Sequence, residues 1–565
     1  MPQPDNSRRQ FLRLSYTVGM GVALPGWLTA CGDGNEPIVP DIAETFTEPD
    51  RLVARNGVLD VQMHIAYADN VLDGRPVHLR SIEGRLTGPT LDIHAGDTLS
   101  VLVHNNLPPN PASVEPNWVF NYPNSTNLHT HGLHADPRIV RPGVYGDYVV
   151  DDPREGIAPG GTRQHEFAIG KDHPPGTYWY HPHLHGSSAV QVSSGMAGAL
   201  IVRGPADQVP EIAAARERLF LFQTPDLNDN GEIPDFASLV KTKIATVYYI
   251  NGLRRPRLLM RPGEVQRWRF INATVGNFLN LSLDSHGLMQ IGHDGNPVQF
   301  PRTIAAGLPE SLVMAPGNRD DILIKAGAPG TYYLRSLAYD MGADKLPEDI
   351  VAEIVVTGEP LTMALPAGPL PMPHMLAPIT DEELASHGGL KRELVFRIVK
   401  NDNGDPITAA PAAALLPVPA GELSLWTFQT GNTFVANTVY AMGSATGVPS
   451  TTPQMPTVYY PFQSSRAIKQ TVALDSVEEW TVYSMDRGQH PMHIHVNPVQ
   501  VIKINGRPVE PFWADTIALP RGGSPEAPVS ITLRSRFTDF KGPFVMHCHL
   551  LLHEDLGMMQ RIEVV

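Results

Sequence analysis

The chain has 565 residues, of which 42% are hydrophobic and 18% are charged, and its formal net charge is −15. At roughly 150 residues per domain this length predicts three or four domains, and the negative charge argues against binding nucleic acid or anionic lipid through a basic surface. Because Cys31 and Cys548 are the only cysteines, a disulfide framework is excluded.

The N-terminus predicts an export signal over residues 1–31. "SRRQFLR" (Ser7 to Arg13) pairs two arginines with Phe and Leu before a mildly apolar run, and it resembles a twin-arginine signal. "LTAC" (Leu28 to Cys31) is similar to a lipoprotein cleavage box. Cys31 is therefore a candidate lipid anchor, and cleavage nearby without a lipid is the alternative. The predicted location is the periplasm, or the outer side of the inner membrane for a lipoprotein.

Beyond the signal, short runs with β-branched residues and period-two alternation dominate, punctuated by Gly and Pro. One pattern occurs three times: an acidic turn leads into an alternating strand, and later a Gly-containing turn leads into an aromatic strand. The first halves read "AGDTLSVLVHN", "PGEVQRWRFIN" and "DSVEEWTVYSM", and the second halves read "PPGTYWYHPHLHG", "APGTYYLRSL" and "KGPFVMHCHL". An internal repeat of this size predicts an all-β protein made of tandem copies of one β-sandwich.

The three copies predict domains over residues 45–204, 205–358 and 391–565. Copies one and three end in histidines, whereas copy two ends in "YYLRS", so the middle domain is predicted to be a structural spacer without metal. A Pro-rich stretch over residues 359–390 is predicted to link into the third domain. Its Met363, Met372, His374 and Met375 are open to a second interpretation as loose copper ligands, although the proline content favours a plain extended linker.

Ten of the 22 histidines stand in four tight groups, two groups in each terminal domain. Neutral imidazole is the commonest transition-metal ligand, so such clustering predicts several metal ions together. The groups are "HTH" (His129, His131), "HPH" (His181, His183), "HPMHIH" (His490, His493, His495) and "HCHLLLH" (His547, His549, His553).

The last group predicts two metal sites on one strand. Successive side chains of a strand point to opposite faces, so His547 and His549 project to one side and Cys548 to the other. A thiolate, two imidazoles and a weak axial thioether make a blue-copper site, for which Cys548, His553 and Met558 supply three ligands and His490 the fourth. The remaining eight histidines suffice for three more coppers, as two three-ligand sites and one two-ligand site.

These motifs resemble those of the multicopper oxidases, the family of laccases, ascorbate oxidase and bacterial copper-efflux oxidases, over nearly the whole mature chain. The resemblance implies three cupredoxin-like Greek-key β-sandwiches and four coppers per chain: one type 1, one type 2 and a type 3 pair. The residue that is usually Trp inside the first motif is Thr130 here, which is not a ligand position. The implied ligands are His490, Cys548, His553 and Met558 for type 1, His129 and His493 for type 2, and His131, His181 and His549 with His183, His495 and His547 for the type 3 pair.

The resemblance also implies acids near the coppers. Glu554 matches the family's glutamate on the proton path, and Asp147 in "GDYV" corresponds to the acid near the type 2 copper, with a surface aspartate as the alternative. Asp486, four residues before the type 1 histidine, matches a carboxylate that hydrogen-bonds that ring, with a solvated turn residue as the alternative. His134 and His185 fit no ligand position, so supporting roles are expected for them.

The activity implied is that of a copper-dependent oxidoreductase, in which four one-electron oxidations of a small reducing substrate drive the reduction of O₂ to water. Electrons would enter at the type 1 copper and cross through Cys548 to the histidine cluster. We expect a laccase-like enzyme that oxidises phenols or aromatic amines, because no long Met-rich insert, such as the copper-efflux oxidases carry, is evident. We also expect the chain to be a monomer. A metallo-oxidase acting on Cu(I), Fe(II) or Mn(II) is the alternative. A copper-free scaffold is a remote one, because such relatives lose ligands that this chain keeps.

Overall fold

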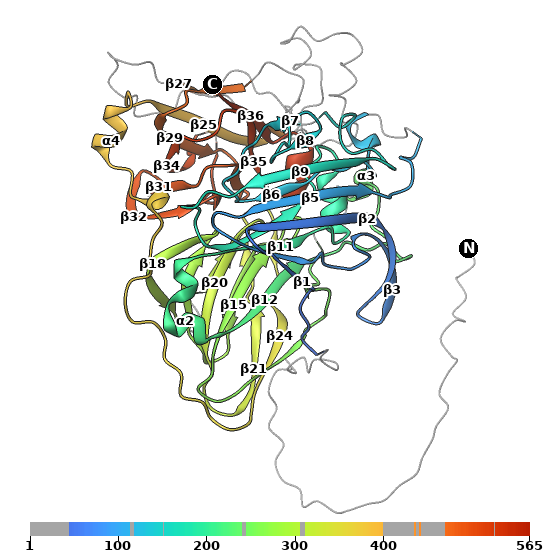
Figure 1. The fold of residues 1–565 in the computed structure, drawn as a ribbon, viewed down its shortest axis with the longest axis vertical. Helices are drawn as coiled ribbons and strands as arrows, with labels where there is room; N and C mark the ends of the chain where they lie inside the picture. Colours follow the sequence, from blue (N-terminus) through green and yellow to red (C-terminus); the bar gives the residue numbers. More distant parts are fainter. Residues whose placement is uncertain are drawn as a thin grey trace, which may run out of the picture. The chain divides into compact units, whose positions relative to one another are not determined.

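The computed structural model describes residues 45–112, 118–150, 152–239, 245–305, 311–398, 434–436, 440–441, 469–524 and 526–565. The predicted signal and Cys31 lie outside these residues. The described chain is almost entirely β-structure, with a few short helices (Figure 1), so the predicted fold class is confirmed. No helix in the described ranges is long and apolar enough to cross a membrane.

The first sandwich joins a five-stranded sheet, in the order β1-β4-β11-β10-β6, to a six-stranded sheet, in the order β3-β2-β5-β9-β8-β7. In β5 half-buried and buried residues alternate, so Leu99, Val101 and Val103 enter the core, where Leu200 and Val202 of the opposite sheet meet them. The strands are β1 (Arg51–Val53), β2 (Val58–Leu72), β3 (Arg75–Ile82), β4 (Thr90–His94), β5 (Thr98–Asn105), β6 (His129–His131), β7 (Ile139–Arg141), β8 (Val144–Tyr145), β9 (Thr162–Ala168), β10 (Gly176–His181) and β11 (Gly198–Arg203).

The second sandwich repeats this plan with the orders β13-β12-β15-β20-β17-β18 and β14-β24-β21-β16-β19. Its core is aromatic: Phe220, Trp268 and Phe270 pack between the sheets and are almost fully buried. The strands are β12 (Arg216–Gln223), β13 (Tyr249–Ile250), β14 (Arg257–Met260), β15 (Val265–Asn272), β16 (Leu279–Leu283), β17 (Leu288–His293), β18 (Asn296–Ile304), β19 (Leu312–Met314), β20 (Arg319–Lys325), β21 (Gly330–Ser336) and β24 (Asp349–Val356), with β22 (Tyr339–Asp340) and β23 (Lys345–Leu346) forming a separate two-stranded sheet.

The third sandwich has the orders β26-β25-β29-β34-β31-β32, with β27 also on β25, and β28-β36-β35-β30-β33. The strands are β25 (Lys391–Ile398), β26 (Phe434–Ala436), β27 (Tyr440–Ala441), β28 (Lys469–Val472), β29 (Ser476–Ser484), β30 (Pro491–Ile494), β31 (Val499–Ile504), β32 (Arg507–Ala514), β33 (Thr516–Ala518), β34 (Val529–Phe537), β35 (Gly542–Cys548) and β36 (Met559–Val564). The described helices are η1 (Trp118–Asn121), α1 (Ser188–Ser193), η2 (Pro205–Gln208), α2 (Pro210–Ala214), α3 (Phe236–Leu239), η3 (His374–Leu376), α4 (Asp381–Ser386) and α6 (Leu551–Asp555).

The Pro-rich stretch between the second and third sandwiches lies against its neighbours. Met363 packs in a small apolar cluster with Val265 and Leu323, and its sulfur accepts the Val265 N–H at 3.3 Å. The backbone N–H groups of His374 and Met375 donate to the Asp172 carboxylate at 3.0 and 2.7 Å. These contacts are those of a packed connection, in which the thioether of Met363 serves as an apolar and hydrogen-bonding group.

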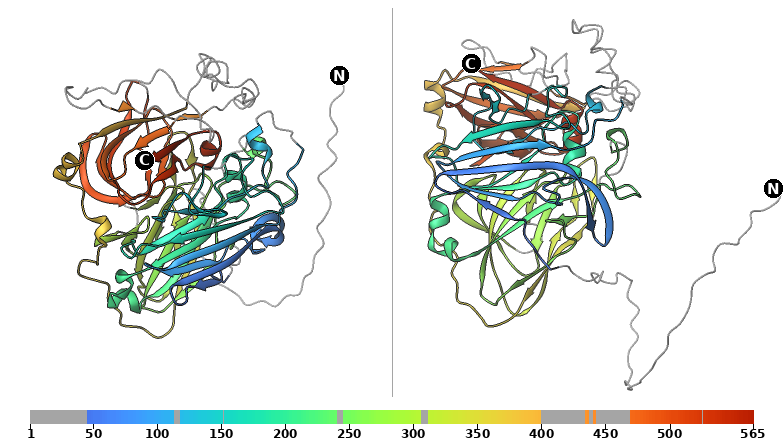
Figure 2. Two further views of the ribbon diagram at one scale, coloured as in Figure 1. Left: turned by 45° about the horizontal axis from the view of Figure 1, so that its top comes forward. Right: turned by 45° about the vertical axis from the view of Figure 1, so that its right-hand side comes forward.

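An ion-pair network joins the first and second sandwiches, in which Arg203 of β11 pairs with Glu217 of β12 at 2.7 Å. Arg269 of β15 is fully buried and pairs with Glu217 at 2.7 Å and with Asp321 at 2.8 Å. It also donates to the hydroxyl of Thr177 in β10, at 2.8 Å. The first and third sandwiches, blue to cyan and orange to red in Figure 2, lie side by side. They meet where His131 of β6 stacks on His493 of β30, and where His183, just after β10, contacts His547 of β35. This second interface contains the histidines.

We predict that Arg269→Ala lowers the free energy of unfolding by about 3–5 kcal/mol, because it leaves the buried Asp321 and the partly buried Glu217 without this cation. Urea unfolding of the metal-free protein measures the loss. Arg141→Ala is the matched control: Arg141 pairs with Glu166 at 2.6 Å on the exposed surface, so its removal should leave the midpoint unchanged. Equal urea midpoints of unfolding for Arg269→Ala and Arg141→Ala would contradict the prediction.

Candidate metal centres

Three donor atoms converge inside the third sandwich. The Cys548 sulfur lies 3.5 Å from Nδ1 of His490 and 3.5 Å from Nδ1 of His553, and the two nitrogens are 3.3 Å apart. The centre of this triangle is about 2 Å from each atom, close to the bond length that imidazole and thiolate make to a transition metal. His490 comes just before β30, Cys548 ends β35, and His553 lies in α6. The geometry and the donor set fit one metal ion.

Cys548 is buried in an apolar core, and this burial raises the pKa of its thiol. A reactive cysteine has a lowered pKa and partial exposure, so this environment disfavours a free nucleophile and requires a cation to hold the thiolate. Met558 returns to the same place: its carbonyl accepts the Cys548 N–H at 3.0 Å, and its N–H donates to the His553 carbonyl at 2.9 Å. Its side chain packs in the cluster that contains Cys548.

Asp486 fixes the orientation of the His490 ring. Its carboxylate lies 3.0 Å from His490 Nε2, which leaves Nδ1 directed at the Cys548 sulfur. The predicted contact between this acid and the histidine is therefore present in the structure. Asp486 is only partly buried, so it lies between the donor triangle and the surface.

Eight histidines gather where the first and third sandwiches meet, and strand alternation places them there. In β35, Phe544, Met546 and Cys548 belong to the third core, while Val545 packs against Val149 and Val150 of the first domain. His547, two residues after Val545, therefore faces the first domain. The same alternation in β30 puts Met492 and Ile494 in the core and His493 on the other face.

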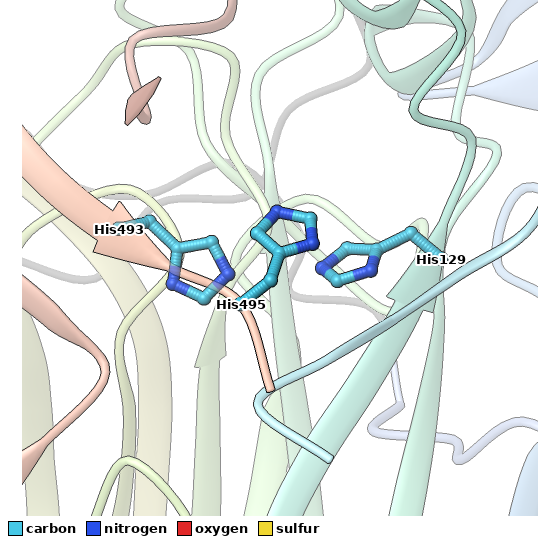
Figure 3. Close-up of side chains that lie close together, drawn as sticks. All are labelled: His129, His493 and His495. Atoms are coloured by element: carbon cyan, nitrogen blue, oxygen red, sulfur yellow. The ribbon is translucent and has the colours of Figure 1, made fainter. Parts of the chain in front are cut away.

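The rings of the two domains interleave. His131 stacks on His493 with centroids 3.8 Å apart, and His129 lies 4.0 Å from His495. Figure 3 shows His495 between His493 and His129, whose side chain comes from the other domain. His183 lies edge-on to His547 at 4.7 Å. All eight side chains are buried, namely His129, His131, His181, His183, His493, His495, His547 and His549.

Their donor atoms form overlapping groups of metal-binding size. Within 4.8 Å of one another lie the donors of His183, His495 and His547, which were predicted to share one ion. His131, His181 and His549, predicted to share another, have ring centroids 4.8 to 5.8 Å apart. His129 and His493, the predicted pair for a third ion, are 5.9 Å apart. The structure thus brings all eight imidazoles predicted for these three ions to one cluster.

Burial favours the neutral form of most of these imidazoles, and several lack hydrogen-bond partners. Burial, followed by the neighbouring histidines, lowers the pKa of His129, His495 and His549 well below the usual range. Several ring nitrogens have no hydrogen-bond partner in the described structure, including Nε2 of His129 and both nitrogens of His549. A buried polar atom without a partner is costly, and deprotonated imidazole is the form that binds metal. The residues therefore fit a multinuclear metal centre.

Asp147 lies beside the first histidine of the cluster. Both of its carboxylate oxygens are 3.0 Å from His129 Nδ1, and one accepts the backbone N–H and the hydroxyl of Thr130, at 2.9 and 3.2 Å. Burial raises the pKa of Asp147 to about 7, although the Thr130 bonds act in the opposite direction. Thr130, the departure from the usual Trp, is thus a hydrogen-bond donor to this acid.

Glu554 is fully buried against two other histidines of the cluster. Its carboxylate lies 3.1 Å from Nδ1 of His547 and 3.5 Å from Nδ1 of His183, so it spans the two domains. Burial raises its pKa, and His183 offsets part of the effect. The next residue, Asp555, accepts the backbone N–H groups of Gly186 and Ala189 at 2.7 and 2.8 Å, which fastens α6 to α1.

A third acid beside the cluster, and its arginine partner from the middle domain, carry no sequence motif. Asp515 lies 3.3 Å from Nε2 of His131 and 3.4 Å from Nδ1 of His493, and Arg319 of β20 pairs with both of its oxygens at 2.7 and 2.6 Å. Burial alone would raise the pKa of Asp515, but Arg319 more than offsets it and the pKa is lowered. The expected spacer therefore contributes a charge to the site. Only spatial neighbours, not motif spacing, identify this pair.

Gly132 makes room for that pair. It has a left-handed backbone with φ +83°, which favours glycine, and a Cβ here would overlap the Arg319 guanidinium. His134, two residues on, bridges the domains: its ring bonds the Val496 carbonyl at 2.9 Å and Asp539 at 2.9 Å. His134 thus has the structural role expected of it.

Comparison with known proteins places all three sandwiches in one family. Three family models, each described as multicopper oxidase, match residues 64–207, 226–357 and 445–565. Laccase-1 of Melanocarpus albomyces is 24% identical over 531 residues, and the aligned region covers 84% of this chain and 73% of that laccase. The multicopper oxidase mco of Staphylococcus epidermidis is 22% identical over 542 residues, covering 94% and 92%.

Solved structures show the same architecture. A multicopper oxidase from Campylobacter jejuni, described as a metallo-oxidase, superposes with a TM-score of 0.67 at 23% identity and covers 92% of this chain and 95% of its own. A laccase from Pediococcus acidilactici gives 0.66 at 19% identity, covering 93% and 94%. These likenesses support the prediction of three tandem cupredoxin-like sandwiches.

We predict that Asp515→Asn weakens copper binding by the histidine cluster about 10- to 100-fold, because it removes the charge that orients His131 and His493. Copper titration of the metal-free protein measures this affinity. The His490–Cys548–His553 centre in the same molecule is the internal control and should keep its affinity. A loss at both centres would indicate general unfolding, and no loss at either would contradict the role given to Asp515.

Proposed function

Since the chain belongs to the multicopper oxidase family, as its sequence motifs predicted, we propose that it couples four one-electron oxidations of an organic substrate to the reduction of O₂ to water. The chain is a copper-dependent oxidoreductase with O₂ as acceptor. The observation that carries the proposal is that β35 serves both donor sets, with Cys548 in the triangle and His547 in the histidine cluster.

We propose four coppers per chain, held as the family resemblance implies. The type 1 ion takes His490, Cys548, His553 and Met558, the type 2 ion takes His129 and His493, and the type 3 pair takes His131, His181 and His549 with His183, His495 and His547. When bound, these ions supply one-electron acceptance at the type 1 site and four-electron reduction of O₂ at the other three. The backbone from Cys548 to its two neighbours is the covalent path between the two sites.

Two of the buried acids are proposed to hold the protons that O₂ reduction consumes. Glu554 lies against His547 and His183, and burial raises its pKa, which favours the protonated form of this carboxyl. Asp147, with a pKa of about 7, is poised to gain or lose a proton beside His129. Because they lie against different histidines, they give the cluster two proton carriers.

A cavity of about 360 Å³ reaches the edges of His490 and His553. Its walls include the apolar side chains of Leu239, Val275 and Leu552, and a cavity of this size and character suits one aromatic ring. We propose that phenols or aromatic amines bind here. Asp486 is the acid that would take the proton an oxidised phenol releases, because it also hydrogen-bonds His490.

Oxidation of Cu(I), Fe(II) or Mn(II) is the second candidate. The same cavity is also lined by Asp226, Asp344 and Asp486, and by Met341, which are oxygen and sulfur donors for such ions. The Campylobacter jejuni relative is described as a metallo-oxidase. The apolar walls favour the organic substrate.

The cellular setting is also proposed. The twin-arginine motif and the cleavage box support export to the periplasm, or anchoring through a lipid on Cys31 at the outer side of the inner membrane. We propose that the exported chain acts as a monomer, since its two donor sets are completed within one chain.

Steady-state oxidation of a phenol, an aromatic diamine, Cu(I), Fe(II) and Mn(II) under identical conditions tests the substrate class. We expect kcat/KM for the organic donors to exceed that for the metal ions, because apolar walls surround the approach to His490 and His553. Asp486→Asn should reduce phenol oxidation more than oxidation of a donor that releases no proton. A clear preference for a metal ion would instead support metal-ion oxidation, the second candidate function.

Cys548→Ser should abolish the intense blue absorption and turnover of organic donors, because it removes the thiolate that defines the type 1 site. The other three coppers should remain, as counted by metal analysis. Cys31→Ser is the matched control, since it replaces the only other cysteine and should leave the absorption unchanged. Full turnover by Cys548→Ser, or one copper per wild-type chain after loading, would overturn the proposed function.

A further inference from the structure

Arg80 is a buried arginine in an unusual place. It lies in β3 opposite Tyr67 of β2, and strand alternation puts it on the same face as Ile82, which packs in the core of the first sandwich. Only 7% of the residue is exposed. Arginine is almost never buried to this extent unless it is paired.

The guanidinium of Arg80 lacks such a pair among the described residues. Its Nε donates to the Asn124 side chain at 3.0 Å, and its central carbon lies 5.0 Å from the Tyr67 ring centroid. The buried arginines 267, 269 and 319 differ, since each contacts at least two carboxylates. Burial lowers the pKa of Arg80, which is the sign of an uncompensated desolvation cost.

Arg80 lines a cavity of about 340 Å³ whose walls are otherwise mostly apolar. Phe120 and Phe236 stack there with ring centroids 4.0 Å apart, and Pro123 and other prolines complete the wall. Among the described residues of the lining the one acid is Asp235, which is exposed and accepts the Ser238 N–H at 2.8 Å. The cavity therefore combines apolar ring and proline surfaces with one buried cation, whose terminal N–H groups make no hydrogen bond to the described residues.

We propose that this cavity binds a small aromatic carboxylate, with the carboxylate on the terminal N–H groups of Arg80 and the ring against the phenylalanine and proline walls. A guanidinium fork pairs with a carboxylate through two parallel hydrogen bonds, which would supply the missing counter-charge. The volume is near the lower end of small-molecule sites, which suits a one-ring ligand. No residue of this lining is shared with the cavity beside His490 and His553, so the site is separate from the proposed substrate site.

Calorimetric titration of the copper-loaded full chain with benzoate tests the proposal. Benzamide, which has the ring without the charge, and acetate, which has the charge without the ring, are the ligand controls. We expect benzoate to bind at least about tenfold more tightly than either, since a hydrogen bond to a charged group is worth roughly that factor or more. Arg80→Gln should remove that advantage. Arg75→Gln, at the other end of β3 and outside the lining, should bind benzoate as the wild type does.

Two further measurements separate a binding role from a structural one. Arg80→Gln should leave the thermal midpoint and the oxidase activity unchanged, because the guanidinium forms no ion pair with the described residues; a merely structural arginine would lower the midpoint. Ile233→Trp, which fills the cavity without touching the charge, should abolish benzoate binding. Equal benzoate affinity in the wild type and Arg80→Gln, benzamide binding as tight as benzoate, or no benzoate binding by the wild type would overturn the proposal.

Discussion

The alternation of side chains along one strand is the constraint on which the rest of this protein depends. In β35 the even-numbered residues Phe544, Met546 and Cys548 enter the third core, while Val545 and His547 face the first domain. A sulfur in the core and an imidazole at the domain interface are thus separated by a single peptide unit. A shift of the strand register by one residue would exchange the two faces, so the core packing of Phe544 and Met546 also fixes where the metal ligands point.

The burial of eight imidazoles between two domains makes this interface unusual. An ordinary interface gains from apolar contact, but here ring nitrogens of His129, His181 and His549 lie buried without partners in the described structure. Metal ions that bind those nitrogens would favour the closed arrangement by mass action, because the unfolded chain does not hold the ligands together. Copper binding and domain association should therefore be coupled, and the acids Asp147, Glu554 and Asp515 set the ring orientations that make the coupling specific.

Much of this could be predicted from sequence because the signals are local. Period-two alternation and the threefold repeat predict the sandwiches, and the spacing of "HTH", "HPH", "HPMHIH" and "HCHLLLH" identifies every imidazole that the structure brings together. The family resemblance also implied Asp486, which stands four residues before His490. The domain boundaries at 204, 358 and 390 stay predictions, as do the ion-by-ion assignments of the ligands.

What the sequence could not reveal depends on contacts between distant segments. Arg319 carries no motif, yet its guanidinium pairs with Asp515 of the third domain and donates from Nε to the Thr177 carbonyl of the first at 3.2 Å. The lack of a carboxylate partner for the buried Arg80 likewise becomes visible only when the positions of the described carboxylates are known. Nothing in the composition of a strand says whether its arginine will meet an acid.

The middle domain contributes to the metal centre although it binds none of the proposed coppers. It supplies no histidine to the cluster, but a single buried cation from its β20 lies between the first and third domains, beside a carboxylate that touches His131 and His493. Because a charge buried at such a junction is costly unless all its partners are present, Arg319 favours the arrangement in which the three domains are assembled together. A domain without metal can therefore still determine the geometry of a metal centre, by making its correct assembly the only one in which this ion pair is complete.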